Sequence, residues 1–111
     1  FETFKRNKNM SEQDVVIFRK IKGDNDIIAI FQNLFHNSWE FHNVCYDMMT
    51  SHGSCDWDWV LDTTVPATEE DYSFLKKHLE GLGYNLKVQK RYNRNKALES
   101  FREFQKQNKT I

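Results

Sequence analysis

Apolar residues fill two short segments near the start of the chain, and a polar turn separates them. Residues 15–22 are rich in β-branched and aromatic side chains, which favour a strand. Residues 23–26, Gly-Asp-Asn-Asp, have the composition of a turn. Residues 27–31 are apolar at every position, a pattern typical of a central strand that is covered on both faces. Together they predict a β-hairpin over residues 15–31.

The next part of the chain is patterned less regularly. We expect a loop over residues 32–40 and a third strand over residues 41–49, where apolar side chains alternate onto one face. Residues 51–54, Ser-His-Gly-Ser, are expected to end that strand. Residues 56–62 space their apolar side chains in a way that suits one or two helical turns.

The clearest helix is predicted after Thr68, which is a good N-cap residue with Asp71 at the capping-box position. Its apolar stripe has helical spacing and consists of Tyr72, Leu75, Leu79 and Leu82. Gly81 and Gly83 favour the end of this helix, because glycine readily adopts the left-handed backbone conformation that follows a helix C-terminus. Beyond them, residues 84–91 alternate as a half-buried strand does, and residues 95–106 carry the stripe of a last helix.

The resulting order, strand-strand-strand-helix-helix-strand-helix, predicts an α+β fold. We expect an antiparallel sheet of about four strands with the helices packed on one face. Residues 13–111 are expected to form a single domain, and residues 1–12 a flexible N-terminal extension. No segment approaches the roughly 20 apolar residues of a membrane span, and no signal peptide is recognisable, so we expect a cytoplasmic protein without a membrane partner.

Charges are segregated along the sequence although they sum to zero. Residues 1–22 have a net charge of +3, residues 23–75 have ten acids with no Lys or Arg, and residues 76–111 have a net charge of +7. Segregation of this kind predicts two faces of opposite sign, one of which a partner recognises. We therefore expect the acids of residues 24–71 to form one continuous patch.

Two binding surfaces are candidates on this basis. The acidic face would imitate the charge of nucleic acid and occupy the basic groove of another protein; its candidate residues are Asp47, Asp56, Asp58, Asp62, Glu69, Glu70 and Asp71. The alternative is nucleic-acid binding by a basic stretch that contains an aromatic residue. Its candidate residues are Lys87, Lys90, Arg91, Arg94 and Lys96, with Tyr92 among them.

Histidines and cysteines gather in one short region. His42-x-x-Cys45 and His52-x-x-Cys55 resemble paired zinc ligands, so a small zinc-supported domain is a further alternative. Six residues separate the two pairs, whereas structural zinc sites place about twelve or more between them, and we therefore expect no metal or other cofactor. A nucleophilic site built from either cysteine with His52 and Asp56 has support from residue type alone. We expect no enzymatic activity.

Several segments resemble a family of small, largely uncharacterised proteins encoded by bacteriophages, prophages and other mobile elements. The shared residues are Val16–Lys20, Asp26–Phe31, Tyr46, His52-Gly53, Asp56, Pro66–Tyr72, Leu75-Lys76 and Leu79–Val88. The resemblance spans roughly residues 15–94, and its most specific part is the passage from helix to strand. No activity is established for that family.

The resemblance implies expression inside a bacterial host cell and a functional loop at Tyr46, His52 and Asp56, which match the Tyr- and His-rich loop of the family. Met48 replaces a further histidine, and neither cysteine belongs to the family pattern, which weakens metal and cysteine chemistry. We therefore predict an accessory protein of a phage or mobile element. It would act as a non-enzymatic binding module that inhibits a host defence protein through its acidic face.

Overall fold

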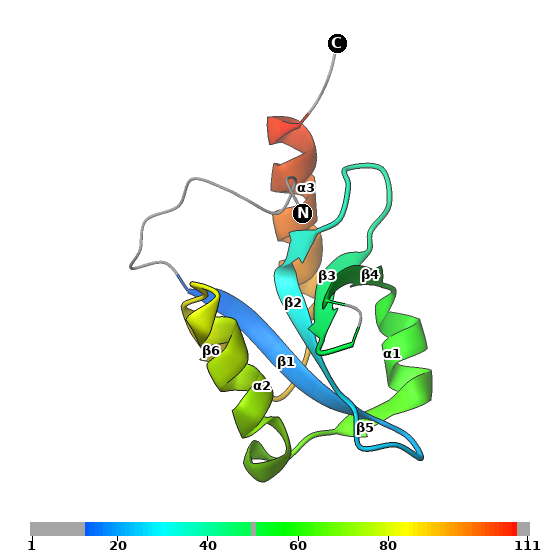
Figure 1. Cartoon of the computed structure of the whole chain (residues 1–111). Coiled ribbons are helices and arrows are strands. Elements are labelled where there is room, and N and C mark those ends of the chain that lie inside the picture. The colour runs from blue at the N-terminus through cyan, green and yellow to red at the C-terminus, as the bar shows by residue number, and fades with distance from the viewer. Residues whose placement is uncertain (1–12, 50, 109–111) are drawn as a thin grey trace.

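The computed structural model describes residues 13–49 and 51–108 of the chain (Figure 1). In chain order the elements are β1 (Asp14–Ile21), β2 (Ile27–Phe35), β3 (Asn43–Asp47), β4 (Ser51–Cys55), α1 (Trp57–Thr63), β5 (Thr64–Pro66), α2 (Glu69–Gly81), β6 (Leu86–Val88) and α3 (Arg94–Gln107). The predicted extension, residues 1–12, lies outside the described residues. None of the described helices is long and apolar enough to cross a membrane.

The strands form one sheet with β2 near its middle. Five of them are ordered β4-β3-β2-β1-β5, and neighbours in this series are antiparallel. β5 pairs with the C-terminal end of β1, and β6 pairs with its N-terminal end in parallel. The central position of β2 confirms the expectation drawn from its apolar residues, which are buried on both faces of the sheet.

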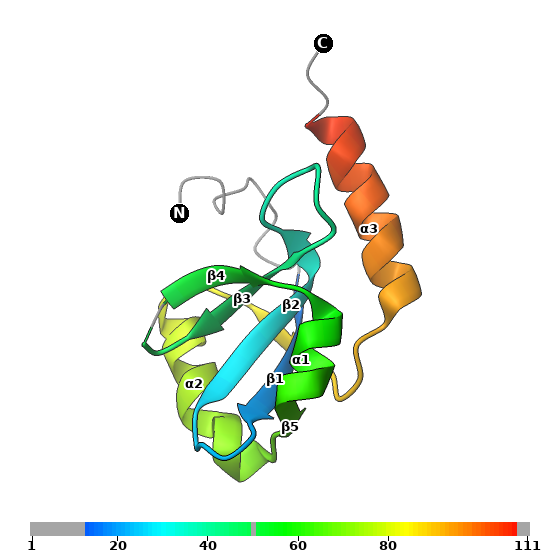
Figure 2. The same ribbon diagram turned by 90° about the vertical axis from the view of Figure 1, so that its right-hand side faces the viewer.

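Helices cover both faces of the sheet (Figure 2). On one face, Leu75 and Leu79 of α2 pack in a core cluster with Phe31 of β2. Successive strand residues point to opposite faces. Ile30 therefore packs on the other face, in a second cluster with Val60 of α1. The sheet is thus the middle layer between α2 and α1.

An irregularity in β2 positions the last helix. The pairing of β2 with β3 shifts register between Phe31 and Phe35, and the Asn43 side-chain amide donates to the Phe31 carbonyl at 3.0 Å. Phe35 then packs against Phe101 and Phe104 of α3, with ring centroids 5.1 and 6.0 Å apart. α3 consequently lies along the end of β2, on the same side of the sheet as α1 (Figure 2).

Local sequence signals account for the turn and for α2. Gly23 adopts a positive φ of 74° in the β1–β2 turn, which a glycine does at little cost. The predicted capping box is formed: the Thr68 hydroxyl accepts from the Asp71 amide, and the Asp71 carboxylate accepts from the Thr68 amide. Gly83 has a φ of 106° just beyond the helix, as a left-handed stop requires.

The predicted α+β class is confirmed, and so are the hairpin and both long helices. Three details of the arrangement were wrong. The sheet has six strands and not about four, because residues 51–54, expected to break a strand, belong to β4, and β5 was not expected. The helices lie on both faces, because Val60 and Leu79 pack on opposite sides. The strand expected over residues 84–91 is three residues long and runs parallel to β1.

Candidate functional site

The acidic residues are divided between two helices. Asp47 ends β3, Asp56 precedes α1 while Asp58 and Asp62 lie in it, and Glu69, Glu70 and Asp71 form the first turn of α2. Because α1 and α2 cover opposite faces of the sheet, the seven residues do not form the single continuous patch that we expected. The structure instead brings Asp47 and Asp71 to one pocket, together with Asp26 of the β1–β2 turn.

Two of the acids pair with bases from other parts of the chain. Arg94 donates to the Asp58 carboxylate at 3.0 Å, and Lys20 lies 3.8 Å from Asp71. Both pairs are at the surface, where such contacts contribute about 0–1 kcal/mol. Their main effect is electrostatic: Asp58 is neutralised by a base of the predicted nucleic-acid stretch, and Asp71 is neutralised in part by β1.

Two of the three residues of the candidate functional loop lie together. Tyr46 and His52 are cross-strand partners in β3 and β4, and their rings meet edge to face with centroids 4.8 Å apart. Asp56 lies beyond the other end of β4, four residues after His52, a separation of about 13 Å along an extended strand. Only Tyr46 and His52 of the candidate functional loop are therefore in contact, and Asp56 is not close to them.

His78 and Tyr84 complete this pair in a way that the sequence analysis missed. The Tyr46 hydroxyl is hydrogen-bonded to His78 Nε2, and His52 Nε2 to the Tyr84 hydroxyl, each at 2.8 Å. These four residues, the Tyr–His cluster, connect the β3–β4 hairpin to α2 and to the segment that follows it. Each partner is 32 residues away along the chain. The available signals were the inward position of Tyr84 and the spacing of His78 three residues after Leu75.

Protonation of His52 is disfavoured in the Tyr–His cluster. Burial lowers the pKa of the His52 imidazole below its ordinary value of 6.5. The neutral ring has one nitrogen that accepts and one that donates, and a tyrosine hydroxyl can do either. The His52–Tyr84 bond therefore forms with neutral histidine at neutral pH. In this geometry the cluster holds the hairpin against α2.

The candidate zinc ligands lie on different faces of the sheet. Cys45 and Cys55 are buried on the face of α1, and their side chains are hydrogen-bonded to each other. His52 faces the opposite side, with Tyr46, and His42 precedes β3, with its Nδ1 3.8 Å from a Glu40 oxygen. Within the described residues, no three His, Cys, Asp or Glu side chains are grouped as a metal site would require.

The hydrogen bond between the two thiols shifts their pKa values in opposite directions and lowers the pKa of Cys45. The hydrogen bond to Cys45 and burial raise the pKa of the Cys55 thiol, so that it stays protonated at neutral pH. Cys45 lies over Gly53, where a Cβ atom would be 3.8 Å from its sulfur. Both cysteines therefore behave as small buried side chains between the edge of the sheet and α1.

The basic stretch is partly engaged in holding the fold together. It extends from Lys87 in β6 to Lys96 in the first turn of α3, and its Arg94 pairs with Asp58. Tyr92, the aromatic residue expected to stack on bases, stacks on Trp57 with centroids 4.3 Å apart. Burial raises the pKa of Tyr92 to about 12. Tyr92 is thus only partly exposed, whereas Arg94 keeps 51 % of its side chain exposed beside Asp58, and the other bases of the stretch are exposed as well.

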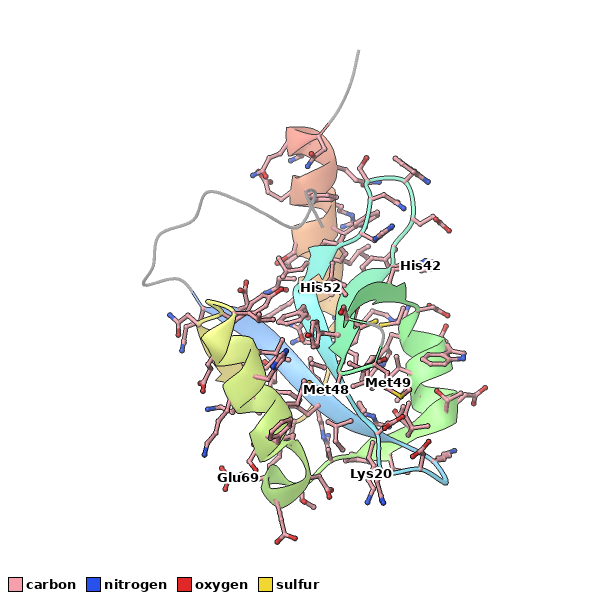
Figure 3. All side chains as sticks on the ribbon, in the orientation of Figure 1. Lys20, His42, Met48, Met49, His52 and Glu69 are labelled. Atoms are coloured by element: carbon pink, nitrogen blue, oxygen red, sulfur yellow. The ribbon has the colours of Figure 1, made fainter. Side chains whose placement is uncertain are left out.

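A pocket of about 210 Å³ opens between α2 and the turns at one end of the sheet. We call it the acidic groove, and its lining residues are Asn25, Asp26, Ile27, Asp47, Met48, Met49, Asp71, Phe74 and Leu75. Large apolar side chains are exposed at its edge: Met48 by 47 %, Phe74 by 71 % and Met49 by 82 %. Figure 3 shows Met48 and Met49 at the turn of the β3–β4 hairpin.

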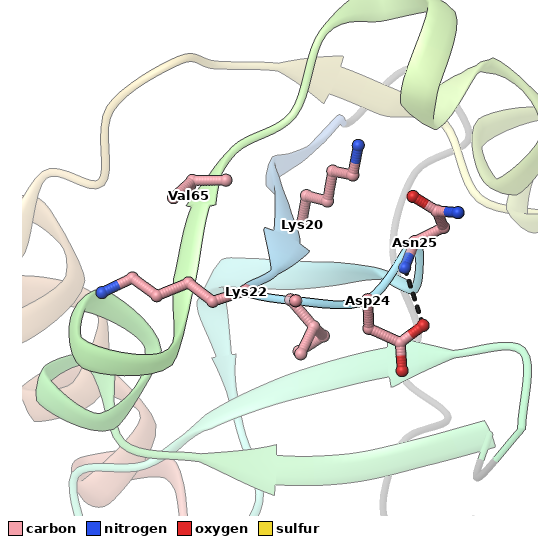
Figure 4. A pocket seen from close by; sticks show the side chains of 7 residues that line it. Lys20, Lys22, Asp24, Asn25 and Val65 are labelled. Carbon is pink, nitrogen blue, oxygen red and sulfur yellow. Dashed lines mark hydrogen bonds between the residues drawn. The ribbon is translucent and has the colours of Figure 1, made fainter.

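A second, wider hollow of about 530 Å³ lies on the β1–β2 turn (Figure 4). Lys20, Lys22, Asp24, Asn25 and Val65 are among its lining residues, and the Asn25 amide donates to the Asp24 carboxylate at 2.7 Å. Charges of both signs and an open shape give it no preference for one kind of ligand. The acidic groove is the more distinctive surface, because both large apolar and carboxylate side chains line it.

The fold and the groove together define a small α+β protein with a partly apolar, carboxylate-rimmed recess. No protein-family model matches the chain, and neither a curated protein nor a solved structure was found to be similar to it. The resemblance to a phage-encoded family therefore stays a prediction.

Proposed function

We propose that this chain is a protein-binding module and that the acidic groove is its docking surface. The observation that carries the proposal is the exposure of Phe74 and Met49 beside a recess bordered by Asp26 and Asp47. Exposed apolar side chains that line a hollow commonly mark interaction sites. Aromatic residues and methionine are enriched at interfaces, and charges around them steer association.

The resemblance to phage-encoded proteins supports a narrower version of the proposal. In that version the partner is a bacterial host protein, such as a defence protein, which the chain inhibits without catalysing a reaction. The acidic residues would imitate the charge of nucleic acid at the binding surface of that protein. In this version the carboxylates around the groove take part, since those of α1 lie on the other side of the sheet.

Capture from a bacterial lysate tests the proposal. Immobilised wild-type chain is compared with a double variant, Phe74→Ala with Met49→Ala, and with Trp39→Ala, and bound proteins are quantified by mass spectrometry. Trp39 is exposed by 78 % in the loop between β2 and β3, so it is a matched control for an exposed apolar residue. We expect a protein that the double variant loses by about tenfold or more and the control retains. Equal capture by all three forms contradicts the proposal.

Nucleic-acid binding through the basic stretch receives less support. Arg94 is 3.0 Å from Asp58, and Tyr92 is stacked on Trp57. Oligonucleotide binding that falls steeply with salt would restore this alternative, because displaced counterions make such binding salt-dependent.

A further inference from the structure

The acidic groove is too small for most whole ligands. Its size is that expected for a site that accepts a single side chain of a larger partner. Small-molecule sites usually occupy about 300–1,000 Å³. A recess of about 210 Å³ suits one or two apolar side chains of a larger partner. Leu75 forms part of its lining, and Phe74 and Met49 stand exposed at its edge, so an inserted side chain would contact apolar atoms on several sides.

The carboxylates around the groove come from three different elements. Asp26 ends the β1–β2 turn, Asp47 ends β3, and Asp71 lies in the first turn of α2. Lys20 neutralises Asp71 in part at 3.8 Å. Asp26 and Asp47 add two further carboxylates to the lining, and Asp47 also accepts from the Met49 amide at 2.9 Å, which holds the hairpin turn in place.

We propose that the occupant of the groove is a basic amphipathic polypeptide segment, in which an apolar side chain enters the recess and flanking Lys or Arg side chains meet Asp26 and Asp47. This inference rests on the proposed function, because it names the partner of the same surface. Charge complementarity selects a basic segment over an acidic one, since like charges brought together at an interface are costly.

Methionine at the hairpin turn fits such an occupant. Its unbranched, polarizable side chain repacks around apolar groups of different shapes, as surfaces that accept amphipathic helices do. Met48 and Met49 line the groove from the hairpin turn and Phe74 lines it from α2, so rotation of these exposed side chains can change its width. The Tyr–His cluster holds the hairpin on α2 beside this site through the Tyr46–His78 bond.

Fluorescence anisotropy with two synthetic peptides tests the inference. The first is a labelled amphipathic helix of leucine and lysine, and the second has glutamate at every lysine position. We expect the lysine peptide to bind wild-type chain at least about tenfold more tightly than the glutamate peptide. Phe74→Ala with Met49→Ala, and separately Asp26→Asn with Asp47→Asn, should each weaken binding several-fold. The carboxylate effect should shrink between about 50 mM and about 0.5 M salt.

Control variants separate a site from general attraction. Asp62 is an exposed carboxylate on α1, outside the groove, and Trp39 is an exposed apolar residue. Asp62→Asn and Trp39→Ala should leave peptide binding unchanged. The inference is overturned if Asp62→Asn weakens binding as much as the Asp26 and Asp47 changes, if both peptides bind equally, or if neither binds.

The two proposals fail in different ways. One outcome is that Phe74→Ala with Met49→Ala loses a lysate protein while the groove variants leave lysine-peptide binding unchanged. The docking surface is then supported, and the inference that its partner is basic is wrong. If lysate capture ignores the groove, the proposed function is wrong. Sedimentation velocity tests whether the chain associates with itself. If it does, and if Phe74→Ala with Met49→Ala abolishes this association, the occupant is a second copy of the chain and the basic-segment inference is overturned.

Discussion

The hydroxyl of Tyr92 donates a hydrogen bond of 2.7 Å to Oδ1 of Asn43, and this bond joins the segment before α3 to the centre of the sheet. The Asn43 amide donates in turn to the carbonyls of Phe31 and Gln32, where the register of β2 shifts. The side-chain oxygen of Gln32 accepts from the Asn93 amide at 2.7 Å. A buried polar network therefore fixes the bulge and the start of α3 at the same time.

Removing the Tyr92 hydroxyl should destabilise the protein. Tyr92→Phe keeps the ring stacked on Trp57 but leaves the buried Asn43 oxygen without this donor, at a cost of about 1–3 kcal/mol. The free energy of unfolding in urea measures the effect. Tyr72→Phe is the matched control, because the Tyr72 ring stacks on Phe18 in the same manner. Equal stability of the two variants would contradict the role given to the Tyr92–Asn43 bond.

The stability of the protein should fall in mild acid because of His52. Its folded-state pKa lies below the unfolded value of 6.5, so protonation favours the unfolded chain. The contribution of neutral His52 is complete above the unfolded value of 6.5 and is lost as the pH falls below it through the lowered folded-state pKa. Unfolding of wild type and of His52→Gln, measured across this range, should show a smaller pH slope in the variant. Identical slopes would mean that another group is responsible.

Local sequence signals were enough to predict the turns and helix ends that depend on neighbouring residues. The turn at Gly23 and the Thr68 capping box each depend on residues close together in the chain, and both were found. β4 was missed because residues 51–55 are small and polar and form a strand only by pairing with β3 at the sheet edge. The face on which each helix packs depends on distant contacts, which periodicity does not encode.

In the candidate site, too, residues close in sequence could be predicted and contacts between distant segments could not. Tyr46 and His52 were identified, and the structure makes them cross-strand partners, but their hydrogen-bond partners come from segments 32 residues away. Charge segregation in sequence did not become one patch in space, since helices of similar charge lie on opposite faces. The acidic groove combines Met49 and Phe74 from separate elements, and no pattern within either segment would reveal it.

The Thr68 cap should stabilise α2 measurably. Thr68→Ala removes the hydroxyl that accepts from the Asp71 amide at 3.2 Å, and loss of such a cap costs about 1 kcal/mol. Thr63→Ala is a suitable control, because the Thr63 hydroxyl donates to the Trp59 carbonyl within α1 and caps no helix start. Thermal unfolding followed by circular dichroism compares them. The prediction is wrong if Thr68→Ala is as stable as the control.

The layer that α2 forms over the sheet should depend on Leu79 far more than on its near neighbour Leu82. Leu79 is fully buried in the core cluster with Phe31, whereas Leu82 is 54 % exposed just after the helix. Leu79→Ala should cost about 2–5 kcal/mol, because it removes buried methyl groups and leaves a cavity. Leu82→Ala should change stability by no more than about 0.5 kcal/mol. Urea unfolding of both variants checks the difference, and similar midpoints would show that α2 does not cover this face as described.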